Sequence, residues 1–120
     1  MLHAELSREI IGSAMTVLNA LKPGLDEKAY ENALVVELKK RGHQVDQQER
    51  FRVFYESVPV DPLAPDLIVD QLVVVDPRVV DEFTPTHVAK MIGHPAATGL
   101  HLALLLNFKQ ADLRWRRIVR

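Results

Sequence analysis

The sequence has no cysteine, which excludes disulfide bonds, thiolate metal ligands and cysteine nucleophiles. It also lacks a long hydrophobic run, since no apolar stretch approaches the ~20 residues that a membrane-spanning helix needs. The first ten residues, MLHAELSREI, do not have the basic region and apolar stretch of a secretory signal. These absences predict a soluble, cytoplasmic protein with no membrane contact and no thiol chemistry.

Charge of one sign is not in excess, because 15 Lys and Arg residues oppose 16 Asp and Glu residues. Proteins that bind nucleic acid without sequence preference usually carry a clear basic excess, so a nucleic-acid role would depend on local charge. A glycine-rich phosphate loop and a serine or cysteine nucleophile motif are also missing. Hydrolases of those kinds are therefore set aside.

Two segments near the N-terminus have the spacing of amphipathic helices, with apolar residues at three- and four-residue steps. Ser7 is a suitable N-cap for the first helix, which the Lys-Pro-Gly of residues 22–24 ends. Asp26 and Glu27 begin the second helix, because acidic side chains favour the positive end of the helix dipole, and Gly42 ends it.

A third helix is predicted to begin at Thr84 and Pro85, a capping hydroxyl followed by a proline whose missing N–H costs nothing in the first turn. Pro95 removes a hydrogen bond and clashes with the carbonyl four residues earlier. The helix is therefore expected to end or kink near Gly93 and His94.

Alternating or continuous apolar residues predict the strands. Prolines at 59, 62 and 65 predict a loop or an irregular edge over residues 57–64, because proline cannot donate to a sheet ladder. The expected strands are residues 44–56, 67–69, 72–75, 101–106 and 114–120. The element order predicts an α+β domain with a mixed central sheet of about five strands flanked by helices.

The strongest candidate site lies between Pro65 and Arg78. Asp66 precedes one predicted strand and Asp76 follows the next, so the two carboxylates are expected at the same sheet end, where neighbouring strands lie about 4.8 Å apart. Arg78 adds a positive charge. A hard divalent ion requires such oxygen ligands, and an attacked phosphate requires positive charge for its developing negative oxygens.

This stretch resembles the PD-(D/E)xK signature of metal-dependent nucleases, as Pro65-Asp66, nine residues, then Asp76-x-Arg78. A second motif, Gly24-x-x-Glu27-x-x-Tyr30, resembles the bacterial GxxExxY protein family, a branch of the PD-(D/E)xK nuclease-like superfamily. The likeness extends over nearly the whole chain, through ELKKRG, QVDQQ, PDLIVD, ATGLHLALLLNF and the closing RRIV. It implies one domain over residues 1–120 with a restriction-endonuclease-like core.

The resemblance implies a role for each candidate residue. Asp66 would be the main metal-binding carboxylate, Asp76 the second ligand, and Glu27 a third carboxylate that positions the ion or the attacking water. The ion would be Mg²⁺ or Mn²⁺. Arg78 stands at the position that is usually Lys and would stabilise the charged transition state, with Lys90 of the third helix as the alternative.

Three consecutive residues depart from the family pattern, because Asp76-Pro77-Arg78 stands where similar sequences read E-L-K. Asp shortens the ligand by one methylene, Arg loses the compact ammonium of Lys, and Pro77 removes a backbone donor. These changes favour a nuclease-like domain with an impaired or inactive site, which binds nucleic acid, a protein partner or a second copy of itself. The alternative is an active Mg²⁺- or Mn²⁺-dependent nuclease that hydrolyses phosphodiesters.

Other candidates have two interpretations each. Tyr30 either orients Glu27 by a hydrogen bond or packs in the core with its hydroxyl satisfied. The basic cluster Arg114-Trp115-Arg116-Arg117 is typical of nucleic-acid contact, although charges on an edge strand also discourage aggregation. Surface or capping roles, rather than metal binding, are expected for His87, His94 and His101.

Overall fold

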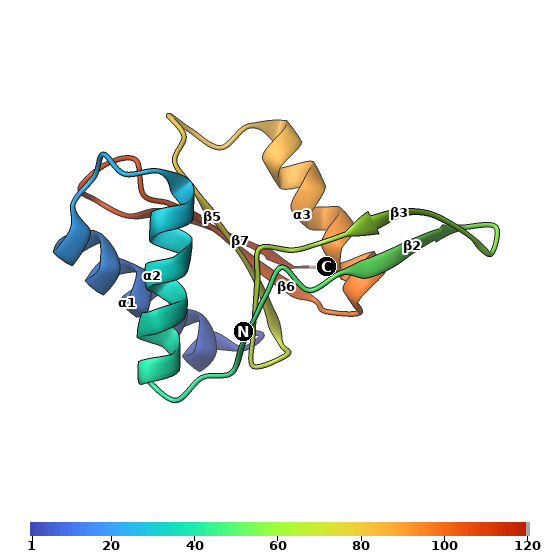
Figure 1. Cartoon of the computed structure of the whole chain (residues 1–120), viewed down its shortest axis with the longest axis horizontal. Helices are drawn as coiled ribbons and strands as arrows, with labels where there is room; N and C mark the ends of the chain where they lie inside the picture. Colours follow the sequence, from blue (N-terminus) through green and yellow to red (C-terminus); the bar gives the residue numbers. More distant parts are fainter. Residues whose placement is uncertain (120) are drawn as a thin grey trace.

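A five-stranded mixed sheet separates two helices on one face from a third helix on the other (Figure 1). The structure is a computed structural model that describes residues 1–119, with the backbone alone for residues 61–63 and 94–96. The helices are α1 (Ala4–Leu21), α2 (Glu27–Lys40) and α3 (Pro85–Thr98). The strands are β1 (Val45–Gln47), β2 (Phe51–Tyr55), β3 (Val58–Leu63), β4 (Leu67–Val69), β5 (Val73–Arg78), β6 (Leu102–Asn107) and β7 (Arg114–Val119).

The main sheet has the strand order β1, β4, β5, β6, β7, and only the β5–β6 pair is parallel. The helix α3 connects these two parallel strands, as a crossover connection requires. The predicted mixed α+β domain with a five-stranded sheet is thus confirmed. None of the helices in the described residues is long and apolar enough to cross a membrane.

The main sheet is covered on both faces. Val73 and Val75 of β5 pack with the buried side chains of α1 and α2. Val74 of β5 and Ala103 of β6 pack instead with Met91 of α3. Every residue of β6 is buried, which explains why this strand reads as a continuous apolar run rather than an alternating one.

The predicted start of the first helix is wrong. The helix α1 begins at Ala4, and Ser7 lies inside its first two turns, 5% exposed. The Ser7 N–H donates to the carbonyl of His3 (2.9 Å), so the first helical turn forms upstream of the predicted cap. The second helix is as predicted, with Asp26 as the N-cap residue.

The third helix begins as predicted but does not end at the proline. The His87 N–H donates to Thr84 Oγ1 (3.2 Å), and α3 continues through Pro95 to Thr98. An interior proline costs a helix about 3 kcal/mol. Packing of the helix against the sheet, where Met91 is completely buried, offsets this cost.

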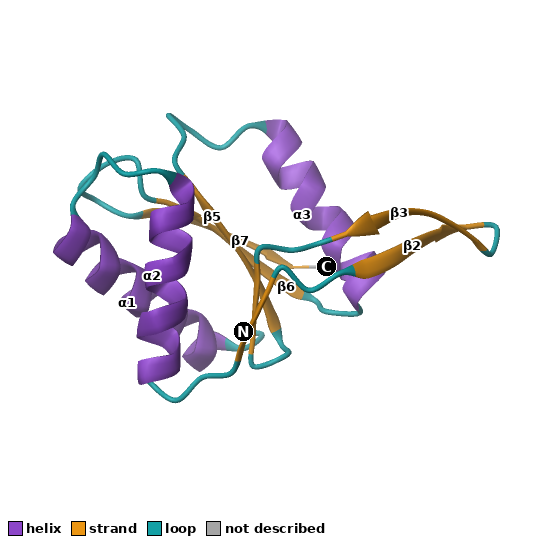
Figure 2. Cartoon of the chain, viewed as in Figure 1, coloured by secondary structure: helices purple, strands orange, loops and turns teal. Residues whose placement is uncertain are grey.

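Of the two predictions for residues 57–64, the irregular edge is correct and the loop is wrong, because β3 pairs with β2 in an antiparallel hairpin whose register shifts between Val53 and Phe54. The predicted strand 44–56 is divided between β1, in the main sheet, and β2. Proline is tolerated in β3 because a two-stranded ribbon has only edge strands. Glu56 and Ser57 have φ values of 47° and 66°, as a tight hairpin turn requires. The hairpin projects from the body of the molecule (Figure 2).

Candidate active site

Asp66 and Asp76 lie beside each other at one end of the β4–β5 hairpin. Leu67 is paired with Val75, so Asp66, just before β4, is next to Asp76 across the ladder. The two carboxyl groups lie close enough for an interaction between them to shift the pKa of each. Asp76 is almost inaccessible, at 3% exposure, whereas Asp66 is half-buried. The structure therefore brings together the two carboxylates that the sequence places ten residues apart.

The pKa values of the two carboxyls move in opposite directions. Burial raises the pKa of Asp76 to about 7, and the hydrogen bond with Asp66 adds to this effect. Burial also raises the pKa of Asp66, but its hydrogen bonds with Asp76 and Gln48 and the charges of Arg78 and Lys90 outweigh burial and lower it. Two adjacent carboxylates resist losing both protons, so the pair retains one proton up to near-neutral pH.

Arg78 lies on the same face of β5 as Asp76, two residues further along the strand. Its Nε donates to Asp76 Oδ2 at 2.9 Å, and both side chains are largely buried. Burial lowers the pKa of Arg78, but the negative charges of Asp76, Glu27 and Asp66 outweigh this effect and raise it. The guanidinium therefore remains charged and is already paired with one of the two candidate metal ligands.

Glu27 reaches the same end of the sheet from the first turn of α2. Its Oε1 accepts a hydrogen bond from the Val79 N–H (3.0 Å), immediately after β5, and its charge acts on Arg78. Within the described residues, however, there is no group of three or more His, Asp or Glu side chains arranged to hold a metal ion. Glu27 thus lies beside Arg78, at the end of the sheet that carries Asp66 and Asp76.

Lys90 lies on an exposed position of α3, the helix that covers this face of the sheet. Its charge contributes to the lowered pKa of Asp66. Among the described residues, the Lys90 amine does not come within 4 Å of a carboxylate oxygen of Asp66 or Asp76, so it forms no ion pair with them. Lys90 is therefore close enough to influence the site electrostatically but does not replace Arg78 at Asp76.

Tyr30 packs in the core, and the interpretation in which it orients Glu27 is wrong. Its hydroxyl donates to the carbonyl of Lys22 (2.6 Å) and accepts from the Leu25 N–H (3.1 Å). Its ring stacks on Phe108, with the centroids 4.9 Å apart. Tyr30 therefore fixes the loop between α1 and α2. This loop in turn positions the start of α2, where Glu27 is the first residue.

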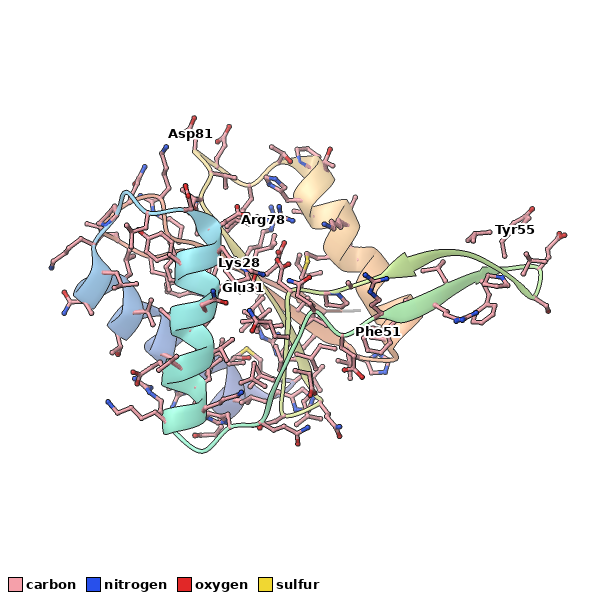
Figure 3. All side chains as sticks on the ribbon, in the orientation of Figure 1. Lys28, Glu31, Phe51, Tyr55, Arg78 and Asp81 are labelled. Carbon is pink, nitrogen blue, oxygen red and sulfur yellow. The ribbon has the colours of Figure 1, made fainter. Side chains whose placement is uncertain are left out.

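A polar network that the sequence did not predict supports Asp66 from the side of α2. Glu31 is only 5% exposed, and its Oε2 accepts hydrogen bonds from Gln47 Nε2 (2.6 Å) and Lys28 Nζ (3.0 Å). Figure 3 shows Lys28 and Glu31 on α2, on the side of the helix that faces the sheet. The sequence contained one signal for the burial of Glu31, because Glu31 lies on the same helical face as the apolar Val35, four residues later.

Gln48 joins this network to the aspartate pair. Its Nε2 lies 3.0 Å from Asp66 Oδ1 and 3.4 Å from Glu31 Oε2, and its backbone N–H donates to the Asp66 carbonyl (3.0 Å). Gln48 has a positive φ of 57°, a conformation that costs a residue other than glycine free energy. Both the backbone and the side chain of Gln48 therefore hold Asp66 in place.

The β7 cluster is divided between the two faces of the sheet. Asp76 is paired with Leu105, and Leu105 with Arg116, so Arg116 lies in the same row as Asp76, roughly 10 Å away across two strands. Arg114 has the same relation to Arg78. These two arginines belong to the face that carries the aspartates and α3.

Trp115 and Arg117 belong to the opposite face. They are paired with Leu106 and Leu104, which pack with α1 and α2. Residues 114–117 therefore do not form a single basic surface, because successive residues of a strand point to opposite sides.

The histidines do not form a metal site in the described residues. His87 has a capping role, because its Nδ1 accepts a hydrogen bond from the Thr84 N–H (3.0 Å). The side chain of His94 lies outside the described residues.

Comparison with known proteins gives one match. A family model described as the PD-(D/E)XK nuclease superfamily matches residues 4–118. Since the match covers nearly the whole chain, the protein belongs to the PD-(D/E)XK nuclease superfamily. No curated protein and no solved structure matches it.

Proposed function

We propose that residues 1–120 form a nucleic-acid-binding domain of the GxxExxY branch of this superfamily, with an impaired nuclease site. One observation carries the proposal: Arg78 Nε lies 2.9 Å from Asp76 Oδ2. Nucleases of this superfamily generally use Mg²⁺ or Mn²⁺. In this chain a fixed guanidinium takes the carboxylate oxygen that such an ion would need.

The donor set therefore does not fit a divalent ion well. Mg²⁺ demands near-ideal octahedral oxygen ligands. If Arg78 moved away from Asp76, the negative charge of Asp76 would stay buried without a partner, which is strongly unfavourable. A lysine at this position would have a single, flexible ammonium, whereas the planar guanidinium forms a directed hydrogen bond. Two of the three departures from the family pattern, Asp76 and Arg78, thus meet in one ion pair.

The face that carries the aspartates supports nucleic-acid binding. Arg78, Lys90, Arg114 and Arg116 all lie on the side of the sheet that α3 covers. Basic groups spaced along one face can neutralise successive phosphates, even when the net charge of the protein is near zero. We infer that DNA or RNA passes along the end of α3 towards Asp66 and Asp76.

The alternative is an active Mg²⁺- or Mn²⁺-dependent nuclease. The support of Asp66 by Gln48 and Glu31 favours it, because catalytic groups need such fixed positions. In this case Asp66 and Asp76 would bind the ion, Glu27 would position it or the attacking water, and Arg78 or Lys90 would stabilise the transition state.

Cleavage and binding assays separate the two functions. Wild type and Asp66→Ala would be incubated with single- and double-stranded DNA and RNA in Mg²⁺ or Mn²⁺, and ion binding would be measured by calorimetry. We expect no cleavage and no ion binding, together with salt-dependent nucleic-acid binding measured by fluorescence anisotropy. Cleavage that is lost in Asp66→Ala would establish the active nuclease instead.

Two further variants make this test sharper. Arg116→Met should weaken nucleic-acid binding several-fold, because it removes one phosphate contact, whereas Arg117→Met on the opposite face should leave it unchanged. The triple change Asp76→Glu, Pro77→Leu and Arg78→Lys restores the family residues and should introduce metal binding. If wild type binds neither DNA nor RNA, a protein partner or a second copy of the chain becomes the better explanation of the domain.

A further inference from the structure

The β2–β3 hairpin carries large apolar side chains that the rest of the described chain does not cover. Phe54, Tyr55 and Val58 are 59%, 67% and 59% exposed. Tyr55 is paired with Val58 and Phe54 with Pro59, so apolar side chains lie on both faces of the ribbon. Figure 3 shows Tyr55 near the tip of the hairpin, whereas Phe51 lies at its base. Because an isolated two-stranded hairpin is only marginally stable in water, this ribbon is expected to gain from a partner.

The two edges of the ribbon differ. The strand β3 contains Pro59 and Pro62, which have no N–H to donate, and the register shift beside Val53 leaves Val60 as an extra, bulged residue. Prolines and bulges are features that keep an edge strand from pairing with another chain. The strand β2 has neither, and within the described part of the chain its outer edge has no neighbouring strand. The β2 edge can therefore accept another strand.

The backbone groups of β2 that face away from β3 follow from the turn. A two-residue turn joins Tyr55 to Val58, so these two residues exchange hydrogen bonds with each other. Hydrogen-bonded and non-hydrogen-bonded pairs alternate along an antiparallel ladder. The N–H and C=O groups of Phe54 and Arg52 therefore point to the outer edge, where a second strand would meet them.

The sequence along this edge, RFRVFYE at residues 50–56, is complementary to itself when two copies run antiparallel. If Val53 lies opposite Val53 of a second copy, the outward backbone groups of Arg52 meet those of Phe54. The same register places Arg50 opposite Glu56. Both of these side chains are exposed, and neither forms an ion pair among the described residues. Opposite charges, and a guanidinium beside an aromatic ring, stabilise cross-strand pairs, and a two-fold axis forms each pair twice.

We propose that two copies of the chain associate through β2 and form a four-stranded antiparallel sheet, in the order β3, β2, β2, β3, across a two-fold axis. Nucleic acid is the less suitable occupant of this edge, because Glu49 and Glu56 offset the charges of Arg50 and Arg52. The contact is narrow, so the dimer should be weak, with a Kd on the order of 10–100 µM. The proposal uses neither the aspartate pair nor the arginines beside it, and is independent of the proposed function.

Sedimentation equilibrium of wild type, from well below to well above this Kd, tests the association itself. We expect a reversible equilibrium between monomer and dimer. A protein that remains monomeric at the highest concentration would overturn the proposal. If that monomer also bound DNA or RNA more weakly after Phe54→Ser, the hairpin would be assigned to nucleic acid instead.

Charge reversal tests the register. Arg50→Glu places acids opposite each other in the dimer, and Glu56→Arg places arginines opposite each other. Each variant alone should weaken the dimer roughly tenfold, because both symmetric pairs change from attraction to repulsion. An equimolar mixture of the two variants should associate as wild type does, since every pair again joins opposite charges. A change that only disturbed the hairpin would not be repaired by mixing, so a mixture that stays monomeric would contradict the register.

Lysine substitutions test which edge is used. Val53→Lys brings two like charges together at the two-fold axis and should weaken the dimer. Val60→Lys, at the exposed bulge of β3, is the matched control and should leave the dimer unchanged. Circular dichroism verifies that both variants fold. Dimerisation that Val53→Lys leaves intact, or that Val60→Lys weakens equally, would overturn the assignment to β2.

Discussion

The two ends of the β4–β5 hairpin place carboxylates in opposite electrostatic situations. At the turn, Asp70 Oδ1 accepts from the Gln44 N–H (2.8 Å) and Asp70 Oδ2 lies 2.7 Å from His43 Nδ1. The other ring nitrogen of His43 lies 3.1 Å from Glu9 Oε1. One imidazole thus joins the N-terminal helix, the segment before β1 and the hairpin turn, with each carboxylate facing a donor.

At the open end of the same hairpin, two carboxyls face each other and share a proton. Burial raises the pKa of Asp76, which means that the folded protein resists its ionisation. The comparison shows that the turn end is organised for stability, whereas the open end keeps an arrangement that lowers stability at neutral pH. Such local costs are typical of functional sites.

The largest effect is expected from Asp70→Ala. This change removes the cap of Gln44 and leaves His43 with one acceptor, and it places alanine at a positive φ of 52°. We expect a loss of about 2–3 kcal/mol in the free energy of unfolding, measured by urea denaturation. Asp70→Asn, which tolerates this backbone conformation and keeps an acceptor, should lose clearly less. Equal losses would show that the carboxylate charge facing His43, not the backbone conformation, determines the effect.

The second prediction is that Asp76→Asn stabilises the protein at pH 8. The pKa of Asp76 is about 7 in the folded protein and near 3.8 in the unfolded chain, so the folded state binds more protons between these values. The contribution of Asp76 to the free energy of unfolding of the wild type is therefore present at pH 4 and falls as the pH rises towards 7. The variant should be more stable by on the order of 1 kcal/mol at pH 8 and show little difference at pH 4.

Urea denaturation of both proteins at several pH values would measure this difference. Asp66→Asn is the matched control, because the pKa of Asp66 is lowered and the sign is reversed. A variant Asp76→Asn that is less stable than wild type at pH 8 would show that the ion pair with Arg78 outweighs the burial of the charge.

A smaller pH-dependent change in stability is expected at the turn end of the β4–β5 hairpin, where the titrating group is a histidine and not a carboxyl. The hydrogen bond with Asp70 raises the pKa of His43 above its ordinary 6.5, despite partial burial, and Glu9 adds to the rise. Stability from this group is fully present below pH 6.5 and is lost as pH rises through the higher folded pKa. His43→Gln should remove this loss, which denaturation at pH 6 and pH 9 would detect. An unchanged pH dependence in the variant would place the titrating group elsewhere.

The smallest effect is expected from Gln48→Ala. The hydrogen bond from Gln48 helps to lower the pKa of Asp66, so its removal should raise that pKa. Carboxyl carbon NMR titration would measure the change, and Gln47→Ala, which removes a donor to Glu31 but not to Asp66, is the control. An unchanged Asp66 titration would show that Gln48 has only a structural role.

Local patterns predicted much of the fold. The second helix has its acidic N-cap and basic last turn in the sequence, and the hairpin around Asp70 and Gln71 has two apolar runs separated by a tight turn. The errors occurred where tertiary contacts override local preference. The helix α3 continues through Pro95 because it packs on the sheet, whereas β3 with its prolines is the irregular edge that the sequence allowed.

The sequence by itself determined that Asp66 and Asp76 meet, because a short antiparallel hairpin fixes which residues are opposite each other. Only the tertiary structure decided what surrounds them. Gln48 and Glu31 approach from other elements, and the sheet register places Arg116 on the face that carries the aspartates and Arg117 on the opposite face. The physical reason is that such contacts join residues distant in the chain, whose positions depend on the packing of the whole sheet and its helices.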